Sequence, residues 1–359
     1  MTERENLLSL LRRQGYERIP VEYSMCPSLS ERFGEFLEAH GHEYPAGYFD
    51  PPWQNAEGDR ATPSDIARFD RYHDPKLLTD PAYSVDNWGV GHLKTPTSMH
   101  MTQMFHPLES ASTVEEIEAY PLGSYDIDAL LPAVRESVEA AQQKGLASLG
   151  NMQCTIWECA WYIRSMEALM MDMLSDGEMA AAMLDKVTEL SEQRARLFAR
   201  AGVDILFLGD DIGMQSSIMM SEELYCEWLK PRLARVISAA KAEKPDLLVA
   251  YHSCGYVEPF IPHLIEVGID ILNPVQPECM DFAELHRQYG DRLSFHGTIG
   301  TQTTMPFGTP GEVKATVERN LRTAGEKGGL LAAPTHLLEP EVPVENVVAY
   351  VEACRNFVL

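Results

Sequence analysis

Short apolar runs alternate with amphipathic stretches along most of the chain. The runs contain few polar positions, which is typical of strands in a parallel sheet, because helices cover both faces of such a sheet. Residues 19–23 form one predicted strand near the N-terminus, with Pro20 at its start. The other predicted strands are residues 146–149, 204–208, 247–252, 270–272, 293–296 and 329–333.

The segments between these runs carry apolar residues at helical spacing. Gly15 ends the first of them, and Thr113 followed by Glu116 matches a capping box. The predicted helices are residues 3–14, 126–144, 157–174, 178–201, 222–243, 257–267, 282–289, 310–324 and 344–356. This succession of strand–helix units predicts an α/β fold, a (β/α)8 TIM barrel. An open doubly wound sheet is the alternative, but no G-x-G-x-x-G motif follows a predicted strand.

Residues from about 43 to 113 interrupt this regular order. Proline, glycine, tryptophan, tyrosine and methionine are common there, and a helical period is hard to find. Residues 98–105 alternate polar residues with Met and Phe, as a half-exposed strand or hairpin arm would. We expect an inserted segment that covers the barrel mouth, within a single domain that spans residues 1–359.

The charge balance narrows the classes of partner. The chain has 54 Asp and Glu against 29 Lys and Arg, a net charge of −25. Nucleic acids and anionic membranes are bound through neutralising lysines and arginines, so we expect neither as a partner. A highly anionic small substrate is also disfavoured, unless basic residues are concentrated locally.

Targeting signals and disulfide patterns are missing from the sequence. No apolar run approaches the roughly 20 residues of a membrane span, and the charged N-terminus lacks the apolar core of a secretory signal. The 7 cysteines, an odd number, suit a reducing compartment. These features together predict a cytoplasmic protein.

Reactive and polar side chains gather where the predicted strands end. In a parallel barrel, the active site is built at the carboxyl ends of the strands and in the adjoining loops. The candidates at these ends are Asn151, Asp210, Asp211, His252, Cys254, Asn273, Gln276, His296 and His336. Such a collection at one end of successive strands is hard to explain by packing alone, and it predicts an enzyme active site.

His252 and Cys254 are separated by one residue. In a strand, residues two apart point to the same face, so the imidazole and the thiol can converge on one point. This pair suits Zn²⁺, and a catalytic zinc has three protein ligands and an open position. His336 is the predicted third ligand, and His296 and Glu158 are the next candidates. The alternative is a hydrogen-bonded structural histidine beside an unreactive cysteine.

Asp210 and Asp211 come directly after an apolar strand. Neighbours in an extended chain point to opposite sides, so we expect only one of them to face the centre. That one is a candidate general base, ligand orienter or substrate partner, whereas the alternative is an aspartate that serves as an N-cap for the next element. Glu158 and Arg164 lie in an aromatic and Met-rich stretch that is typical of core, where an isolated charge is costly.

Several motifs together resemble one known family. They are GVDILFLGDDIG, YHSCG, GIDILNPVQP, LSFHGTIGTQ and the C-terminal LAAPTHLLEPEVPVENVVAYVEA. The chain resembles the uroporphyrinogen decarboxylase superfamily, which also contains zinc-dependent corrinoid methyltransferases, and the resemblance covers most of the chain. His252 and Cys254 match zinc ligands of the methyltransferase branch. His336 stands where that branch has a second cysteine and where the decarboxylase branch has a histidine.

The resemblance implies a zinc-dependent transfer of a methyl group between a corrinoid and a thiol or similar acceptor. The corrinoid would be carried by a partner protein that docks over the barrel mouth. Zinc would be held by His252, Cys254 and His336, and Asp210 or Asp211 would orient a ligand or hold the small-molecule substrate. The remaining candidates are assigned to substrate binding or to fixing the imidazoles: Asn151, Glu158, Asn273, Gln276 and His296. A homodimer is the default expectation for the oligomeric state.

Two other functions stay open at this point. One is a metal-free decarboxylase (lyase) of a carboxylated substrate, with His336 and Asp210 as acid and base. The R-Q-A-G-R-Y pattern of true uroporphyrinogen decarboxylases is absent, since residues 12–18 read RRQGYER. The other is a non-catalytic corrinoid- or tetrapyrrole-binding protein, in which residues 83–105 line a flat pocket.

Overall fold

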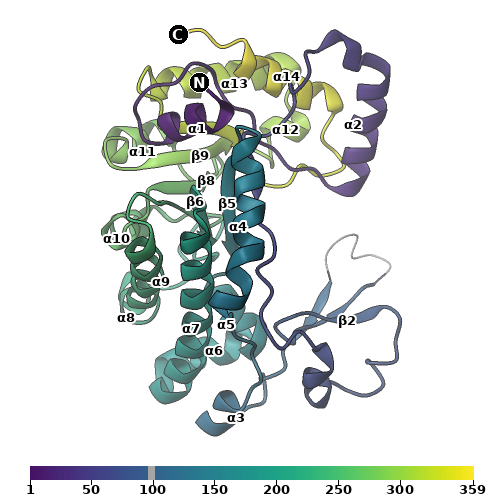
Figure 1. The fold of residues 1–359 in the computed structure, drawn as a ribbon, viewed down its shortest axis with the longest axis vertical. Helices are drawn as coiled ribbons and strands as arrows, with labels where there is room; N and C mark the ends of the chain where they lie inside the picture. The colour runs from purple at the N-terminus through teal and green to yellow at the C-terminus, as the bar shows by residue number, and fades with distance from the viewer. Residues whose placement is uncertain (96–101) are drawn as a thin grey trace.

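The computed structural model describes residues 1–95 and 102–359, and its centre is a curled, seven-stranded parallel sheet in the order β1-β5-β6-β7-β8-β9-β10 (Figure 1). Helices pack outside the sheet, as in a TIM barrel, so the predicted α/β barrel class is confirmed. The strands are β1 (Trp53–Asn55), β5 (Ala147–Gln153), β6 (Ile205–Gly209), β7 (Leu248–His252), β8 (Ile271–Val275), β9 (Ser294–Ile299) and β10 (Leu330–Pro334).

Each predicted helix is present, in some cases divided. The helices are α1 (Glu3–Leu11), α2 (Pro27–His40), α3 (Val114–Glu118), α4 (Ile127–Gln143), α5 (Trp157–Arg164), α6 (Met166–Ser175), α7 (Gly177–Ala201), α8 (Glu222–Trp228), α9 (Lys230–Glu243), α10 (Ile261–Val267), α11 (Phe282–Tyr289), α12 (Thr304–Phe307), α13 (Pro310–Ala324) and α14 (Val344–Arg355). Of these, α2, α3 and α12 are helices that the sequence did not predict. Predicted helix 157–174 breaks at Ser165, which adopts a positive φ of 70°. Predicted helix 222–243 breaks at Leu229, and Pro231 lies in the first turn of α9, because proline lacks the N–H that a continuous helix needs. The predicted capping box of Thr113 and Glu116 is present at the start of α3.

The predicted strand at residues 19–23 is wrong. Both backbone groups of Glu22 bond the hydroxyl of Tyr350 on α14, with the N–H donating over 3.1 Å and the carbonyl accepting over 2.9 Å. A side chain therefore takes the hydrogen bonds that a neighbouring strand would have taken. The chain pairs with the segment after β10 slightly later, where Met25 bridges Leu338.

Residues 53–55 of the predicted insertion are β1 of the barrel sheet. The later part of the insertion forms a small antiparallel sheet of β2 (Tyr83–Val85), β3 (Gly91–Leu93) and β4 (Gln103–Phe105), drawn at the lower right of Figure 1. It packs against α5, since the N–H of Leu108 donates to the carbonyl of Ile163 over 2.9 Å. Residues 103–105 of the predicted hairpin arm are in a strand, and residues 98–101 lie outside the described residues. The single-domain assignment and the covering of the barrel mouth remain predictions.

No helix among the described residues is long and apolar enough to cross a membrane.

Candidate active site

A cavity of about 540 Å³ opens at the carboxyl ends of the barrel strands. Most of the predicted site residues line it: Asn151, Glu158, Asp211, His252, Cys254, Asn273, His296 and His336. Gln276 lines an adjoining cavity of about 380 Å³, whose wall also contains Cys254 and His336. The structure therefore brings these candidates to one end of the barrel, as the strand order predicts.

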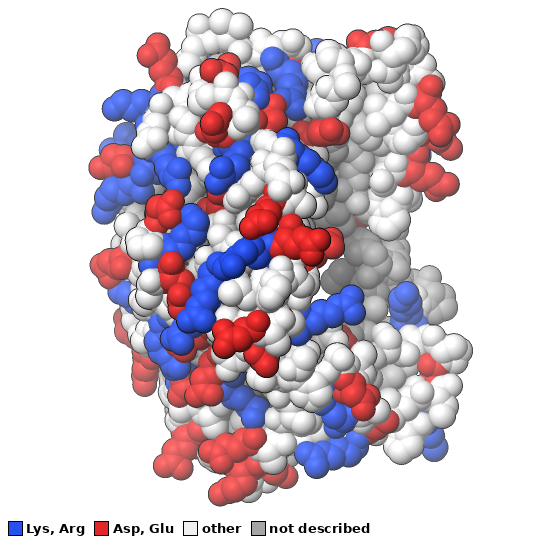
Figure 2. All heavy atoms as spheres, viewed as in Figure 1, with Lys and Arg blue, Asp and Glu red and all other residues white. Residues whose placement is uncertain are grey.

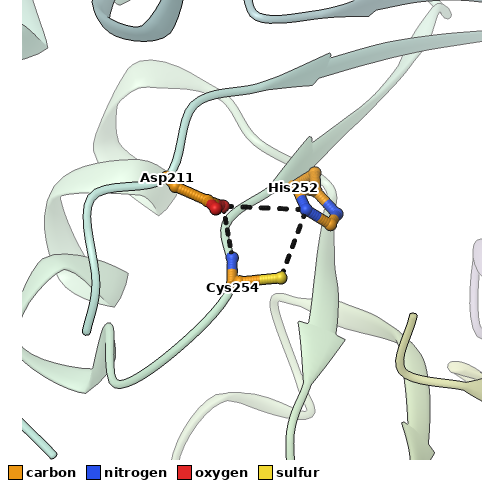
Figure 3. A group of neighbouring side chains, drawn as sticks. All are labelled: Asp211, His252 and Cys254. Atoms are coloured by element: carbon orange, nitrogen blue, oxygen red, sulfur yellow. Dashed lines mark hydrogen bonds and ion pairs between the residues drawn. The ribbon is translucent and has the colours of Figure 1, made fainter. Parts of the chain in front are cut away.

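Asp211, His252 and Cys254 form the compact group of possible metal ligands within this cavity (Figure 3). One ligand atom from each lies within 4.8 Å of the others. The Nε2 atom of His252 is 3.5 Å from the sulfur of Cys254 and 3.7 Å from Oδ1 of Asp211. The backbone N–H of Cys254 donates to the same Oδ1 over 2.7 Å, which holds the carboxylate beside the thiol.

The hydrogen bonds of Asn273 determine which nitrogen of His252 faces this group. The Asn273 amide donates to the backbone carbonyl of His296 over 3.2 Å, so its Oδ1 is directed at His252. That oxygen lies 2.7 Å from Nδ1 of His252 and can only accept a hydrogen bond. Nδ1 therefore carries the proton, and the lone pair of Nε2 points toward Cys254 and Asp211.

The donor set fits a zinc ion. Burial, together with the charges of Asp211 and Glu158, raises the pKa of Cys254 to about 12, and burial lowers the pKa of His252. A thiol of this kind is not a nucleophile at neutral pH by itself, whereas a coordinating metal deprotonates a thiol. One sulfur, one imidazole nitrogen and one carboxylate oxygen are ordinary zinc ligands.

Asp210 faces away from the cavity and caps α5. Its carboxylate accepts hydrogen bonds from the backbone N–H of Ile156, over 3.0 Å and 3.1 Å, and of Glu158, over 2.9 Å. This residue is 3% exposed. Asp210 therefore has the capping role that was the alternative for these two aspartates, and Asp211 is the one that lines the cavity.

Glu158 lies at the start of α5 and reaches the loop of Asp211. It accepts hydrogen bonds from the backbone N–H of Asp211 over 3.2 Å and from the hydroxyl of Tyr162 over 3.0 Å. Burial, with the nearby charge of Asp211, raises the pKa of Glu158 to about 7. Arg164, the other charge noted in this stretch, is instead paired with Asp172 over 2.9 Å away from the cavity.

Among the wall residues that were not predicted from the sequence, three surround His296: Glu22, Trp53 and Phe207. Glu22 lies 2.9 Å from Nε2 of His296. The rings of Trp53 and Phe207 contact the imidazole of His296 edge-on, with centroids 5.4 Å and 6.1 Å away. The position of Phe207 could have been predicted. It lies two residues before Gly209, the last residue of β6, and side chains two apart in a strand point to the same face. The short β1 that carries Trp53 has no such pattern.

A curled parallel sheet with a polar cavity at the carboxyl ends of its strands defines a (β/α)-barrel protein. The sequence profile of the uroporphyrinogen decarboxylase (URO-D) family matches residues 98–357. The chain therefore belongs to the uroporphyrinogen decarboxylase family.

Relatives of the chain include enzymes of two kinds. A methylated-thiol–coenzyme M methyltransferase of Methanosarcina mazei is 26% identical over 236 residues, which are 63% of this chain and 58% of the relative. The match thus spans little more than half of that methyltransferase. A uroporphyrinogen decarboxylase of Coxiella burnetii is 21% identical over 258 residues, 70% of this chain and 69% of the relative.

A solved structure of a methyltransferase from Methanosarcina mazei has the same fold. It superposes on this protein with a TM-score of 0.67, at 18% identity, and the match covers 98% of each chain. This likeness confirms the barrel architecture.

Proposed function

We propose that this protein is a zinc-dependent methyltransferase that moves a methyl group from a corrinoid protein to a thiol. The observation that carries the proposal is the convergence of Asp211, His252 and Cys254 within 4.8 Å at the active end of the barrel. The methyltransferase relative of Methanosarcina mazei supports the same chemistry.

Asp211, His252 and Cys254 are the proposed zinc ligands, which leaves one position open for the acceptor thiol. The sequence predicted His336 as the third ligand. Asp211 is preferred because its carboxylate is already held beside Cys254 and His252. His336 is exposed and lines both cavities, so we assign it to the acceptor side of the site.

The protein's own groups prepare the acceptor sulfur for attack. A thiol bound to zinc has a lowered pKa and is a thiolate at neutral pH. Asn273 fixes the tautomer of His252, and the N–H of Cys254 fixes Asp211. In the transfer, sulfur forms a bond to the methyl carbon, the bond between the donor and that carbon breaks with its electron pair left on the donor, and the thiol proton is released.

The donor is proposed to be a separate corrinoid protein that docks over the barrel mouth. The cavity opens at the carboxyl ends of the strands, where a methyl group presented from outside could meet a sulfur held near Cys254. The small-molecule acceptor would then enter before the partner docks.

Metal analysis of single variants tests the proposal. The purified protein is expected to bind one zinc per chain, and Cys254→Ala, His252→Ala and Asp211→Ala should each lower zinc affinity at least about 10-fold. A matched control is Cys226→Ala, because Cys226 also lies beside a histidine, 3.6 Å from Nε2 of His263, but on the outer helices α8 and α10. Zinc binding that is lost in the control and kept in the cavity variants would refute the proposal.

A metal-free decarboxylase is the second candidate. Glu158, whose pKa is raised to about 7 by burial and by Asp211, is suited to proton transfer at neutral pH, and the Coxiella burnetii relative carries this activity in its name. A decarboxylase of this kind would keep its activity after dialysis against a chelator, whereas the proposed methyltransferase would lose it.

A further inference from the structure

Lysine and arginine are absent from the described walls of both cavities. Neither the cavity of about 540 Å³ nor the adjoining one of about 380 Å³ is lined by lysine or arginine among the described residues. The sequence of residues 96–101, PTSMHM, contains none either. An anionic head group is usually held by lysine or arginine, and the described walls offer it neither.

The acidic side chains of the walls are numerous by comparison. Glu22, Glu158 and Asp211 line the larger cavity, and Glu339 and Glu341 line the adjoining one. If Asp211 and the thiolate of Cys254 neutralise a zinc ion, the other acidic side chains still line the two cavities.

An aromatic and acidic wall lies apart in sequence from the proposed metal ligands. Trp53 on β1 and Phe207 on β6 contact the ring of His296, and Glu22 holds the same imidazole from the segment before α2. The faces of aromatic rings and a carboxylate together attract an ammonium group. The same surface contains no lysine or arginine to pair with a sulfonate or a carboxylate.

The basic residues of the chain are used elsewhere. On the face in Figure 2, lysines and arginines lie among acidic side chains. The ion pairs Arg200–Glu243 and Arg235–Glu192 join the outer helices α7 and α9. Arg13 bonds Ser294 at the amino end of β9, which is the opposite end of the barrel from the cavity. The net charge of −25 would in addition attract cations toward the site.

We infer that the acceptor carries a neutral or positively charged end, such as an amine, which binds against Glu22, Trp53 and Phe207, and that anionic thiols are poor acceptors. This inference rests on the proposed thiol acceptor and adds the charge class of the substrate to it.

Three thiols that differ only in their head groups test the inference. They are cysteamine, 2-mercaptoethanol and 2-mercaptoethanesulfonate, with an ammonium, a hydroxyl and a sulfonate on the same two-carbon thiol. Calorimetric titration of the zinc-loaded protein should give the affinity order ammonium, hydroxyl, sulfonate, with at least about a 10-fold difference between the ends of the series.

Glu22→Gln separates the head group from differences in thiol acidity. Glutamine keeps a hydrogen-bonding group toward His296 and removes the charge, so the ratio of ammonium to sulfonate affinity should fall about 3-fold or more. Glu318→Gln removes the same charge from the exposed side of α13 and should leave the ratio unchanged. A thermal melt establishes that both variants fold.

The possible results separate the two proposals. Thiols that bind in the reverse order, or a ratio that Glu22→Gln does not change, overturn the inference and leave the proposed methyl transfer intact. A zinc-loaded protein that binds none of the three thiols overturns the proposed function and the inference with it.

Discussion

Removal of the Asn273 side chain should weaken zinc binding without removing a ligand. In Asn273→Ala the imidazole of His252 loses the acceptor that lies 2.7 Å from its Nδ1. Its ring and tautomer are then no longer fixed, so Nε2 would spend less time directed at Cys254 and Asp211. The backbone carbonyl of His296 also loses its 3.2 Å hydrogen bond from the Asn273 amide.

The size of the expected loss comes from the usual strength of such supporting hydrogen bonds. Groups that orient a metal-bound histidine contribute about 10–100-fold to metal affinity, which is about 1.4–2.7 kcal/mol. Asn273 is 7% exposed, so little water is available to replace its oxygen, and we expect the upper half of this range. The lost hydrogen bond to His296 should lower the free energy of unfolding by about 1 kcal/mol.

Competition with a chromophoric chelator measures zinc affinity, and urea unfolding measures stability on the same samples. Asn273→Asp is the matched variant, because its carboxylate still accepts the proton of Nδ1 and should keep affinity within about 3-fold of the wild type. If Asn273→Ala bound zinc as tightly as the wild type, the assigned role of Asn273 and the orientation of His252 would both be wrong.

Other substitutions test the fold around the site. Asp172→Ala leaves the guanidinium of Arg164 buried without its ion pair of 2.9 Å, and urea unfolding should show a loss of about 3 kcal/mol. Gly209→Ala would place a Cβ 2.7 Å from the Cβ of His252, so the imidazole must shift and zinc affinity should fall about 10-fold. Burial opposes ionisation of Asp204, but hydrogen bonds from Arg4 and Ser148 lower the pKa of its carboxyl group overall. Its contribution to stability is therefore present above about pH 4 and is lost as the pH falls further. In Asp204→Asn, the urea midpoint should depend less steeply on pH in this range.

A partly exposed ion pair supplies the control for Asp172. The side chain of Lys314 is 44% exposed and pairs with Glu352 over 2.6 Å. Lys314→Ala should cost less than about 1 kcal/mol, because exposed pairs are screened by water. Equal losses in the two variants would mean that burial does not set the strength of these pairs.

The barrel strands could be predicted because their apolar runs are nearly continuous. Predicted strand 247–252 differs from β7 by one residue at its start, and predicted helices 282–289 and 310–324 coincide with α11 and α13. Turn and cap residues mark the ends of these elements. Strands that are buried on both faces have nearly continuous apolar sequences, which indicates a parallel sheet.

The first strand of the barrel could not be predicted from a local pattern. Residues 19–23 have strand composition, but the hydroxyl of Tyr350, more than 300 positions later, takes the backbone hydrogen bonds of Glu22. β1, in contrast, has only the residues Trp53–Asn55 and pairs with β5 across a long separation in sequence. Tertiary contacts, and not propensity, decide both cases.

The paired aspartates show how the fold connects the barrel to its site. Because Asp210 and Asp211 are neighbours in an extended segment, one must face the structure behind the strand when the other faces the cavity. Asp210 caps the helix that carries Glu158, and Glu158 in turn accepts the N–H of Asp211. The position of the carboxylate beside His252 and Cys254 therefore depends on α5, and a substitution that loosens α5 should act on zinc affinity even though α5 supplies no proposed ligand.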